Sequence, residues 1–300
     1  MAGLYPQMSF RTLGRTARHG RQWTHERNHR NDSAEDRGAG RRRADQLSDR
    51  GPPGRPARAD AARNVLGPRL APRARPSRRR GAAALAVDLP GLGRSGGRLT
   101  PETATVPALA DWVTRFAAAL GLCGPVALAG HDIGGAVAQH LLAHDRLDIS
   151  RFALVNSVLY DSWPAPHVAR FREGDGTEGV LAGRREAIAR VLAGVATESL
   201  IAEYADPWTD ERVRRSWTAL AGAADNRYTL ELVPALRRST TPKLLIWGED
   251  DLHETVEHAE RFASEMPRTT LIRIPDADHI PTENAPDRIG RALADFFTVA

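Results

Sequence analysis

The stretch 129-AGHDIGGAVAQHLL-142 decides the fold, because an apolar run ends there in a tight turn and an apolar helical pattern begins. The run predicts a strand that ends at Ala129, and the helix is expected to begin near Gly134. Asp132 then occupies the turn, with Gly130 and Gly134 at positions where a Cβ atom would clash. Such a turn would lift the Asp132 side chain beside a helix N-terminus, where backbone N–H groups stabilise negative charge. An aspartate that only caps the helix has the same local pattern, so this stretch alone leaves both interpretations open.

Apolar runs and helical patterns alternate from residue 81 onward. Five short runs predict strands: 83-AALAVD-88, 125-PVALAG-130, 151-RFALVNS-157, 243-KLLIWG-248 and 269-TTLIRI-274. Helical patterns accompany them at 107-PALADWVTRFAAALGL-122, 134-GGAVAQHLLAHD-145, 257-EHAERFASEM-266 and 286-PDRIGRALADFF-297. Most of the runs are continuous rather than alternating, as in strands that are covered on both faces. The sequence therefore predicts an α/β fold with a mostly parallel sheet.

One insertion breaks this alternation. Residues 161–236 contain helix-like stretches at 182–195 and 209–222 and no convincing strand. We therefore expect a helical cap domain there. The core domain is then expected in two parts, residues 81–160 and residues 237–300.

Residues 1–80 differ from the rest of the chain in composition. Ile, Val, Leu and Phe together account for 7 of them, whereas Arg, Ala, Gly and Pro account for 46. With so little apolar surface, burial cannot offset the chain entropy lost on folding, and we expect a largely disordered, Arg-rich segment. Residues with GC-rich codons dominate the composition of this segment. Such a composition resembles the translation of a GC-rich gene in a wrong reading frame. We therefore expect that this segment is out of frame with the rest.

The charge of the chain is unevenly distributed. Residues 1–80 carry 20 Arg and 7 acidic residues, whereas residues 81–300 carry 22 Lys and Arg and 30 acidic residues. The net charge of +5 thus combines a basic segment with an acidic remainder. Because the basic segment lacks Lys entirely, unlike most arms that bind nucleic acid, we expect no nucleic-acid partner.

Composition also restricts the location of the protein. No apolar run approaches the ~18 residues of a membrane span, and the N-terminus has no apolar signal region. The single cysteine, Cys123, excludes an internal disulfide and suits a reducing compartment. We expect a cytoplasmic protein with a small-molecule substrate, no membrane partner, no cofactor and no metal. The sequence does not indicate an oligomeric state.

Two further strand ends carry candidate side chains. In 245-LIWGEDDLH-253 the strand ends in Trp-Gly, and Asp250 and Asp251 follow it. In 271-LIRIPDADHIP-281 the strand is followed by His279 on a loop. With the turn described above, three strand ends deliver Asp, Asp and His, in that order, to one edge of a parallel sheet, where ligands bind in open α/β folds. Together they favour a catalytic triad over unrelated surface loops.

From residue 81 to the C-terminus the chain resembles the α/β-hydrolase family. The resemblance is carried by 87-VDLPGLGRSG-96, 130-GHDIGG-135, 246-IWGEDD-251 and 278-DHIPTENAPD-287. By position it implies that Asp132 is the nucleophile and His279 the base. It implies Asp251 as the acid, three residues beyond the glycine that follows Trp, with Asp250 as the second choice.

A carboxylate at the place of the usual serine changes the expected chemistry. Serine attacks acyl carbon, whereas a carboxylate displaces well at saturated carbon when the leaving group is a halide or an opened epoxide oxygen. The product is an alkyl ester, which a water activated by His279 would hydrolyse. Asp132 therefore resembles the nucleophile of the haloalkane dehalogenase and epoxide hydrolase branch.

The choice between these two reactions depends on hydrogen-bond donors. Both groups commonly carry Trp directly after the nucleophile, and in dehalogenases its indole N–H holds the halide. Here that position is Ile133, which has no donor. The segment 225-DNRYTLEL-232 resembles the epoxide hydrolase cap motif that carries a tyrosine proton donor, so Tyr228 is the first candidate and Tyr204 or Tyr160 its partner. An epoxide hydrolase-like enzyme is the first expectation; a haloalkane dehalogenase, an esterase or lactonase-like hydrolase and an inactive relative are the alternatives.

Family members begin with further strands, one of which ends in a His-Gly turn that supplies a second oxyanion N–H. No such strand is predicted here, because His19-Gly20 follows 11-RTLGRTAR-18, which has no strand pattern. The resemblance therefore implies missing N-terminal strands, one oxyanion donor too few, and an impaired enzyme.

Overall fold

The computed structural model describes residues 9–14, 83–169, 183–192 and 194–298. All of them belong to one compact unit, made of Met1–Thr16 and Ala61–Ala300. A second unit, Ala17–Asp60, lies outside the described residues, as does His19-Gly20.

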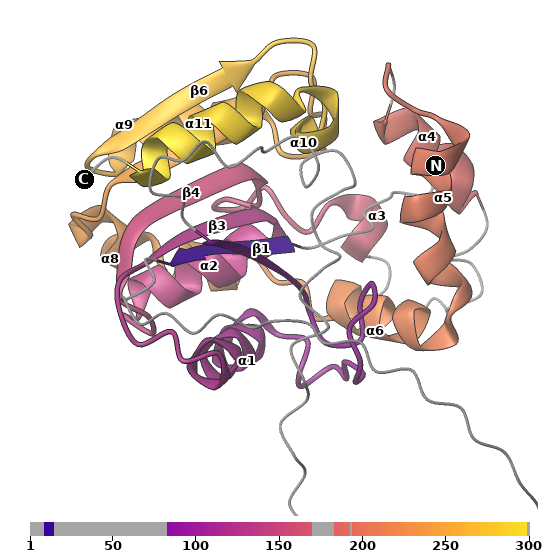
Figure 1. Cartoon of the computed structure of the whole chain (residues 1–300), viewed down its shortest axis with the longest axis horizontal. Coiled ribbons are helices and arrows are strands. Elements are labelled where there is room, and N and C mark those ends of the chain that lie inside the picture. The colour runs from indigo at the N-terminus through magenta and orange to yellow at the C-terminus, as the bar shows by residue number, and fades with distance from the viewer. Residues whose placement is uncertain (1–8, 15–82, 170–182, 193, 299–300) are drawn as a thin grey trace, which may run out of the picture. The chain divides into compact units, whose positions relative to one another are not determined.

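A six-stranded sheet forms the centre of this unit (Figure 1), in the order β2-β1-β3-β4-β5-β6. Its strands are β1 (Ser9–Gly14), β2 (Ala83–Asp88), β3 (Val126–Asp132), β4 (Ile149–Ser157), β5 (Lys243–Gly248) and β6 (Thr269–Ile274). The four strands from β3 to β6 pair in parallel. All five strands predicted from the apolar runs are present, and the α/β fold with a mostly parallel sheet is confirmed.

The strand β1 is a correction to the expectation that residues 1–80 contain no strand. It pairs antiparallel with β2 and with β3, and so occupies the position between them. Phe10 lies opposite Gly130 and Gly14 opposite Val126, so the carboxyl end of β1 is at the edge of the sheet away from Asp132. Residues 9–14 can form a strand without an alternating apolar pattern, because the backbone groups of β2 on one side and β3 on the other supply the hydrogen bonds. The rest of residues 1–80 lies outside the described residues.

Both faces of the sheet are covered by helices, among them α1 (Val106–Ala119), α2 (Ile133–Ala143) and α11 (Pro286–Thr298). Leu128, Leu154 and Leu245 point into the larger core cluster, with side chains of α1 and α2. Their neighbours along the strands, such as Ala153 and Ile246, point into another cluster with Ile289 and Leu293 of α11. Continuous apolar runs in these strands follow directly, because successive side chains point to opposite faces and both faces are buried.

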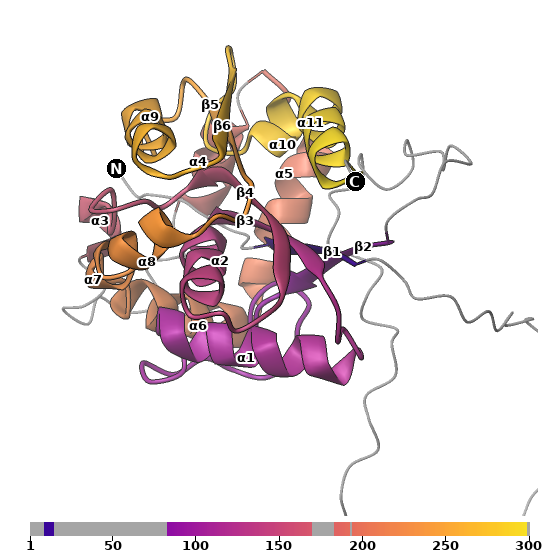
Figure 2. The same ribbon diagram turned by 90° about the vertical axis from the view of Figure 1, so that its left-hand side faces the viewer.

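Helices connect the strands and pack on both sides (Figure 2). They are α1 (Val106–Ala119), α2 (Ile133–Ala143), α9 (Val256–Glu265), α10 (Pro281–Asn284) and α11 (Pro286–Thr298). Figure 2 shows α9 and α11 on opposite sides of β5 and β6. The start of α1 is set by Thr105, whose side chain accepts a hydrogen bond from the Ala108 N–H.

The described residues of the chain between β4 and β5 form helices joined by loops, with no strand among them. Its helices are α3 (Pro166–Ala169), α4 (Arg184–Val191), α5 (Glu198–Ala205), the 3-10 helix η4 (Asp206–Thr209), α6 (Glu211–Gly222), α7 (Arg227–Leu230) and α8 (Val233–Arg238). In Figure 1, α4, α5 and α6 lie to one side of the sheet, whereas α7 and α8 contact α2. By α7 the chain has returned to the core helix α2, and a separate cap domain in residues 161–236 stays a prediction.

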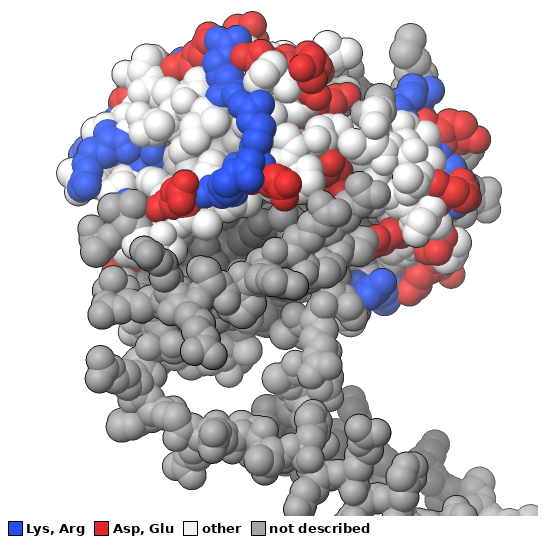
Figure 3. Space-filling view, turned by 45° about the horizontal axis from the view of Figure 1, so that its top comes forward, with Lys and Arg blue, Asp and Glu red and all other residues white. Residues whose placement is uncertain are grey.

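The surface carries both signs of charge. Figure 3 shows acidic and basic side chains interspersed on the face that it displays. Arg273, for example, pairs with both Glu249 and Glu260 at 2.5 Å. No helix among the described residues is long and apolar enough to cross a membrane.

Candidate active site

Asp132 lies at a strained turn between β3 and α2. It is the last residue of β3, α2 begins at the next residue, and its backbone has φ 50° and ψ −130°. A positive φ is unusual for a residue with a side chain and persists only where the surroundings hold it. Here the Ser157 hydroxyl and the Val158 N–H both donate to the Asp132 carbonyl, at 3.1 and 3.3 Å. The end of β4 therefore holds the turn in place.

Two glycines allow the strand and the helix to meet so closely. A Cβ atom on Gly130 would lie 2.6 Å from the Gly134 carbonyl oxygen and 2.6 Å from the Gly135 Cα. A Cβ atom on Gly135 would lie 1.5 Å from the Ser157 hydroxyl oxygen. The close approach predicted at Gly130 is present, and the structure shows another at Gly135.

His279 and Asp251 meet beside this turn. His279 Nδ1 lies 2.8 Å from Asp251 Oδ2, and both side chains are buried. Asp251 Oδ1 accepts hydrogen bonds from the N–H groups of His253 and Glu254, at 2.9 and 3.0 Å. Asp250, the other candidate acid, is exposed to solvent. The structure thus brings Asp251 to His279, and not Asp250.

Asn156 is a residue of this site that the sequence interpretation did not include. Its side-chain amide donates to Asp251 Oδ2 at 2.8 Å, and its carbonyl oxygen accepts from Gly248 N–H at 2.8 Å. It is fully buried at the end of β4, with φ 32°. The sequence signal that could have identified Asn156 is a polar residue at the carboxyl end of a buried strand, since Asp132, Asp251 and His279 follow strands at the same edge of the sheet.

The charges of these groups are strongly coupled. Burial alone would raise the pKa of Asp251, but the neighbouring His279 and the amide of Asn156 lower it to about 2. Burial alone would lower the pKa of His279, but Asp251, Asp132 and Glu254 raise it to about 9. Burial raises the pKa of Asp132, and His279 partly opposes that shift. The site therefore favours an imidazolium at His279 that is paired with the ionised Asp251.

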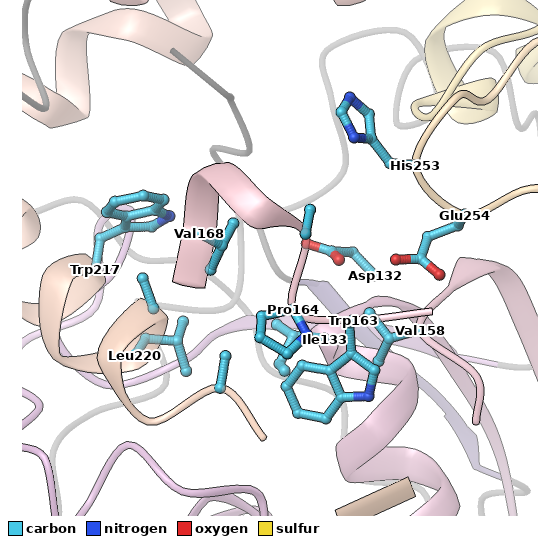
Figure 4. A pocket seen from close by; sticks show the side chains of 13 residues that line it. Asp132, Ile133, Val158, Trp163, Pro164, Val168, Trp217, Leu220, His253 and Glu254 are labelled. Carbon is cyan, nitrogen blue, oxygen red and sulfur yellow. The ribbon is translucent and has the colours of Figure 1, made fainter. Parts of the chain in front are cut away.

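A small apolar cavity of about 70 Å³ adjoins Asp132 (Figure 4). This is several times the volume that a single water molecule requires. Its described lining consists of Asp132, Ile133, Val158, Trp163, Pro164, Ala165, Val168, Trp217, Leu220, Ala221, Ala224, His253 and Glu254. Most of the lining is apolar, and the few polar groups gather at the end where Asp132 lies. Such a cavity suits a small apolar ligand whose reacting atom faces the carboxylate.

Tyr228 and Tyr204, the candidate proton donors, make contacts with other parts of the structure. Neither is among the described residues that line the cavity. Tyr204 donates from its hydroxyl to Glu283 at 2.9 Å, and Tyr160 donates to Glu265 at 3.0 Å. Tyr228 is partly buried against the larger core cluster, because α7 packs on α2. Ile133, by contrast, lines the cavity as its position after Asp132 requires.

A sequence profile of the alpha/beta hydrolase family matches residues 53–292. The chain belongs to this family. The architecture described above agrees with that membership. The protein is therefore a hydrolase of the alpha/beta family.

Three proteins are similar to this alpha/beta hydrolase over parts of its chain. The uncharacterized hydrolase YugF of Bacillus subtilis is 29% identical over 100 residues, which are 33% of this chain and 35% of the relative. A haloalkane dehalogenase of Bradyrhizobium diazoefficiens is 33% identical over 137 residues, 42% of this chain and 44% of the relative. The match thus spans less than half of either relative. The crystal structure of the haloalkane dehalogenase DbeA from Bradyrhizobium elkani shares the fold with a TM-score of 0.57 and 23% identity, over 73% of this chain and 81% of that one.

The described residues of this alpha/beta hydrolase supply one side of an oxyanion site. The Ile133 N–H, at the start of α2, favours the negative charge of the Asp132 carboxylate. In the family that the sequence resembles, a His-Gly turn after an N-terminal strand supplies a second donor, and the sequence predicted that this turn is missing here. The strand β1 cannot bring such a turn to Asp132 from its carboxyl end, because it runs antiparallel to β3. Among the described residues, no group of three or more His, Cys, Asp or Glu side chains could hold a metal ion.

Proposed function

We propose that this alpha/beta hydrolase acts on small apolar substrates at a saturated carbon, through an alkyl ester on Asp132, with epoxides as the first candidate substrates. The observation that carries the proposal is the Asp132 carboxylate, held at a strained turn and facing an apolar cavity beside His279. A buried carboxylate is poorly solvated and therefore a better nucleophile toward carbon than it would be in water.

His279 serves the second half of the reaction. In the free enzyme the negative charge of Asp132 helps to raise the pKa of His279. Formation of the ester removes that charge, so the pKa of His279 falls and the imidazolium releases its extra proton to solvent. The neutral imidazole can then accept a proton from water. Asp251 keeps Nδ1 as the protonated nitrogen, which leaves Nε2 as the basic one. The resulting hydroxide attacks the ester carbonyl and releases the product.

The donors around the cavity favour an epoxide over a halide. A departing halide needs N–H donors, and Ile133 offers no side-chain donor at the position beside the nucleophile. The indole N–H of Trp163 is already donated to the Thr229 hydroxyl at 2.7 Å. An opened epoxide oxygen instead needs an acid, and the cavity contains one in Glu254.

Haloalkane dehalogenation is the second candidate. Two observations favour it: the indole of Trp217 lines the cavity, and the dehalogenase of Bradyrhizobium diazoefficiens is 33% identical over the matched residues. Figure 4 shows Trp217 on the far side of Val168 from Asp132. A halide held by Trp217 would therefore leave from a different part of the cavity than an oxygen held at Glu254.

Trapping the ester tests the proposed function. The variant His279→Gln is incubated with 1,2-epoxybutane or with 1-bromobutane, and the intact mass and the peptide that contains Asp132 are measured. We expect an adduct of the whole epoxide on Asp132, with diol formed by the unsubstituted enzyme. An adduct and halide release with 1-bromobutane alone would favour the dehalogenase. His258→Gln, on α9 outside the lining of the cavity, is the matched control and should turn over without accumulating adduct. Absence of an adduct with both compounds would show that the proposal is wrong.

A further inference from the structure

Glu254 faces Asp132 across the cavity. Figure 4 shows its carboxyl group directed toward that of Asp132, and both residues line the same space. Glu254 is 4% exposed, so water solvates it hardly at all. A buried glutamate in an otherwise apolar cavity is costly and therefore calls for a chemical reason.

The position of Glu254 is fixed through both of its backbone groups. Its N–H donates to Asp251 Oδ1 at 3.0 Å, and its carbonyl oxygen accepts from the buried Trp247 indole N–H at 2.6 Å. Its side chain is held as well, because the Ser162 hydroxyl donates to Glu254 Oε2 at 2.5 Å. Ser162 in turn accepts from the Leu159 N–H at 3.1 Å. A group held in this way is oriented before a substrate arrives.

Two carboxyl groups that face each other in one dry cavity do not both ionise readily. Asp132 has the closer support for a negative charge, from His279 and from the Ile133 N–H. Burial raises the pKa of Glu254 to about 8, and the charges of Asp132 and Asp251 add to that shift. Because Asp132 has this support and Glu254 does not, we assign the negative charge of the pair to Asp132 and the proton to Glu254.

We propose that Glu254 is the acid that protonates the leaving oxygen while Asp132 attacks an epoxide carbon. This assignment rests on the proposed function. An Asp132 oxygen forms a bond to the carbon, the ring carbon–oxygen bond breaks, and its electron pair takes the proton of Glu254. The products are a hydroxyalkyl ester on Asp132 and the Glu254 carboxylate, so the cavity carries one negative charge before and after the step.

The second half of the cycle restores the proton. Water attacks the ester, the diol leaves, and hydrolysis of an ester releases a carboxylic acid. Asp132 returns to its ionised form, supported by His279 and the Ile133 N–H, and the released proton passes to the Glu254 carboxylate. No external acid is consumed, and water adds to the epoxide overall.

Glu254 thus takes the part that tyrosines were expected to play. The described tyrosines do not line the cavity, whereas Glu254 does. It also follows Asp251 by three residues, so the loop that places the triad acid behind His279 places Glu254 in front of Asp132.

The rate of ester formation tests the assignment. In the His279→Gln background, which stops at the ester, we compare adduct formation from 1,2-epoxybutane with and without Glu254→Gln, by mass spectrometry of quenched samples. Glutamine has the shape of a neutral glutamic acid and can keep the Ser162 contact, but it cannot give up a proton. We expect the rate to fall at least about a hundredfold, as is typical for the loss of a general acid. Glu257→Gln, exposed in the first turn of α9, is the control and should leave the rate unchanged.

The pH profile provides a second measurement that does not depend on the folding of the Glu254 variant. The groups around Glu254 are Asp132 on β3, Asp251 and His253 on its own loop, and His279. With His279 replaced by Gln, Glu254 should titrate as the required acid, and the alkylation rate should fall as the pH rises through the pKa of Glu254. A flat profile over this range, or an unchanged rate in Glu254→Gln while the ester still forms, would overturn the role of Glu254 alone. Absence of the ester in His279→Gln with Glu254 intact would remove the proposed function and this role together.

Discussion

Asn156 donates a hydrogen bond at 2.8 Å to the same Asp251 oxygen that lies 2.8 Å from His279 Nδ1. Asn156, at the end of β4, therefore contacts the acid of the candidate triad directly. Its amide favours the ionised form of Asp251, and Asp251 in turn holds the ring of His279. The pair links the last residues of β4 to the two loops that follow β5 and β6.

The variant Asn156→Asp tests that link. It keeps the size of the side chain and its tolerance of a positive φ, but it replaces a donor by a second carboxylate oxygen at Asp251. We expect the free energy of unfolding at pH 7 to fall by about 1–3 kcal/mol, because a buried hydrogen bond is lost and two carboxyl groups are brought together. Urea denaturation measures the loss. Unchanged stability would mean that the amide contributes little to holding Asp251.

Asp132→Asn should separate activity from stability. An amide cannot form the alkyl ester, so turnover of 1,2-epoxybutane should be lost. Because the site as a whole raises the pKa of Asp132, burying the ionised carboxylate costs free energy that a neutral side chain does not cost. The neutral amide should therefore leave the melting temperature equal to or above that of the unsubstituted protein. Asp161→Asn, at an exposed position, is the control for both measurements. Retained turnover with Asn confirmed at position 132 would remove this residue from the mechanism.

Gly130→Ala should destabilise the turn severely. The added Cβ would meet three backbone atoms of the first turn of α2 at 2.6–2.7 Å, and backbone atoms cannot move aside cheaply. Overpacking of this kind typically lowers the free energy of unfolding by about 1–3 kcal/mol or more. Any shift of the turn would also displace Asp132. Gly124→Ala, where nothing lies within 4 Å of the added atom, is the matched control. Thermal denaturation of the two variants gives the comparison, and equal melting temperatures would contradict it.

Stability should fall as the pH rises from about 5 to 9. His279 has a folded pKa of about 9, above its ordinary 6.5, so its contribution is complete below 6.5 and is lost as the pH rises through 9. Glu254 acts in the same direction, because its pKa of about 8 lies above its ordinary 4.5 and the folded state binds the extra proton between these values. Asp251 acts at the acid end: its contribution is present above 3.8 and is lost as the pH falls toward 2.

Urea midpoints at pH 5, 7 and 9 measure this dependence. Glu254→Gln removes one titrating group, so its stability relative to the unsubstituted protein should improve between pH 5 and pH 8. A difference between the two proteins that does not change with pH would show that Glu254 is already ionised in the folded state.

The amino-acid sequence by itself determined the alternation of strands and helices from residue 81 onward. Runs such as 243-KLLIWG-248 are apolar at every position apart from their ends. Such a run is typical of a strand whose side chains are buried on both faces of the sheet. The turn at Asp132 could be recognised in the same way, because a tight turn between strand and helix needs glycine on either side. The approach of His279 to Asp251 followed from topology, since carboxyl ends of parallel strands share one edge.

Only the tertiary structure decided the remaining features, because they depend on contacts between segments far apart in the chain. The six residues of β1 have no strand pattern of their own and become a strand where β2 and β3 leave unpaired backbone groups between them. Tyr228 is directed to the core because α7 packs on α2, which no local pattern reports. In the sequence, Glu254 is one of several acidic residues in a polar loop. It faces Asp132 only because hydrogen bonds with Asp251, Trp247 and Ser162 hold it there. Local periodicity sets which face a residue takes on its own element, whereas the partner across a cavity is set by how the elements pack.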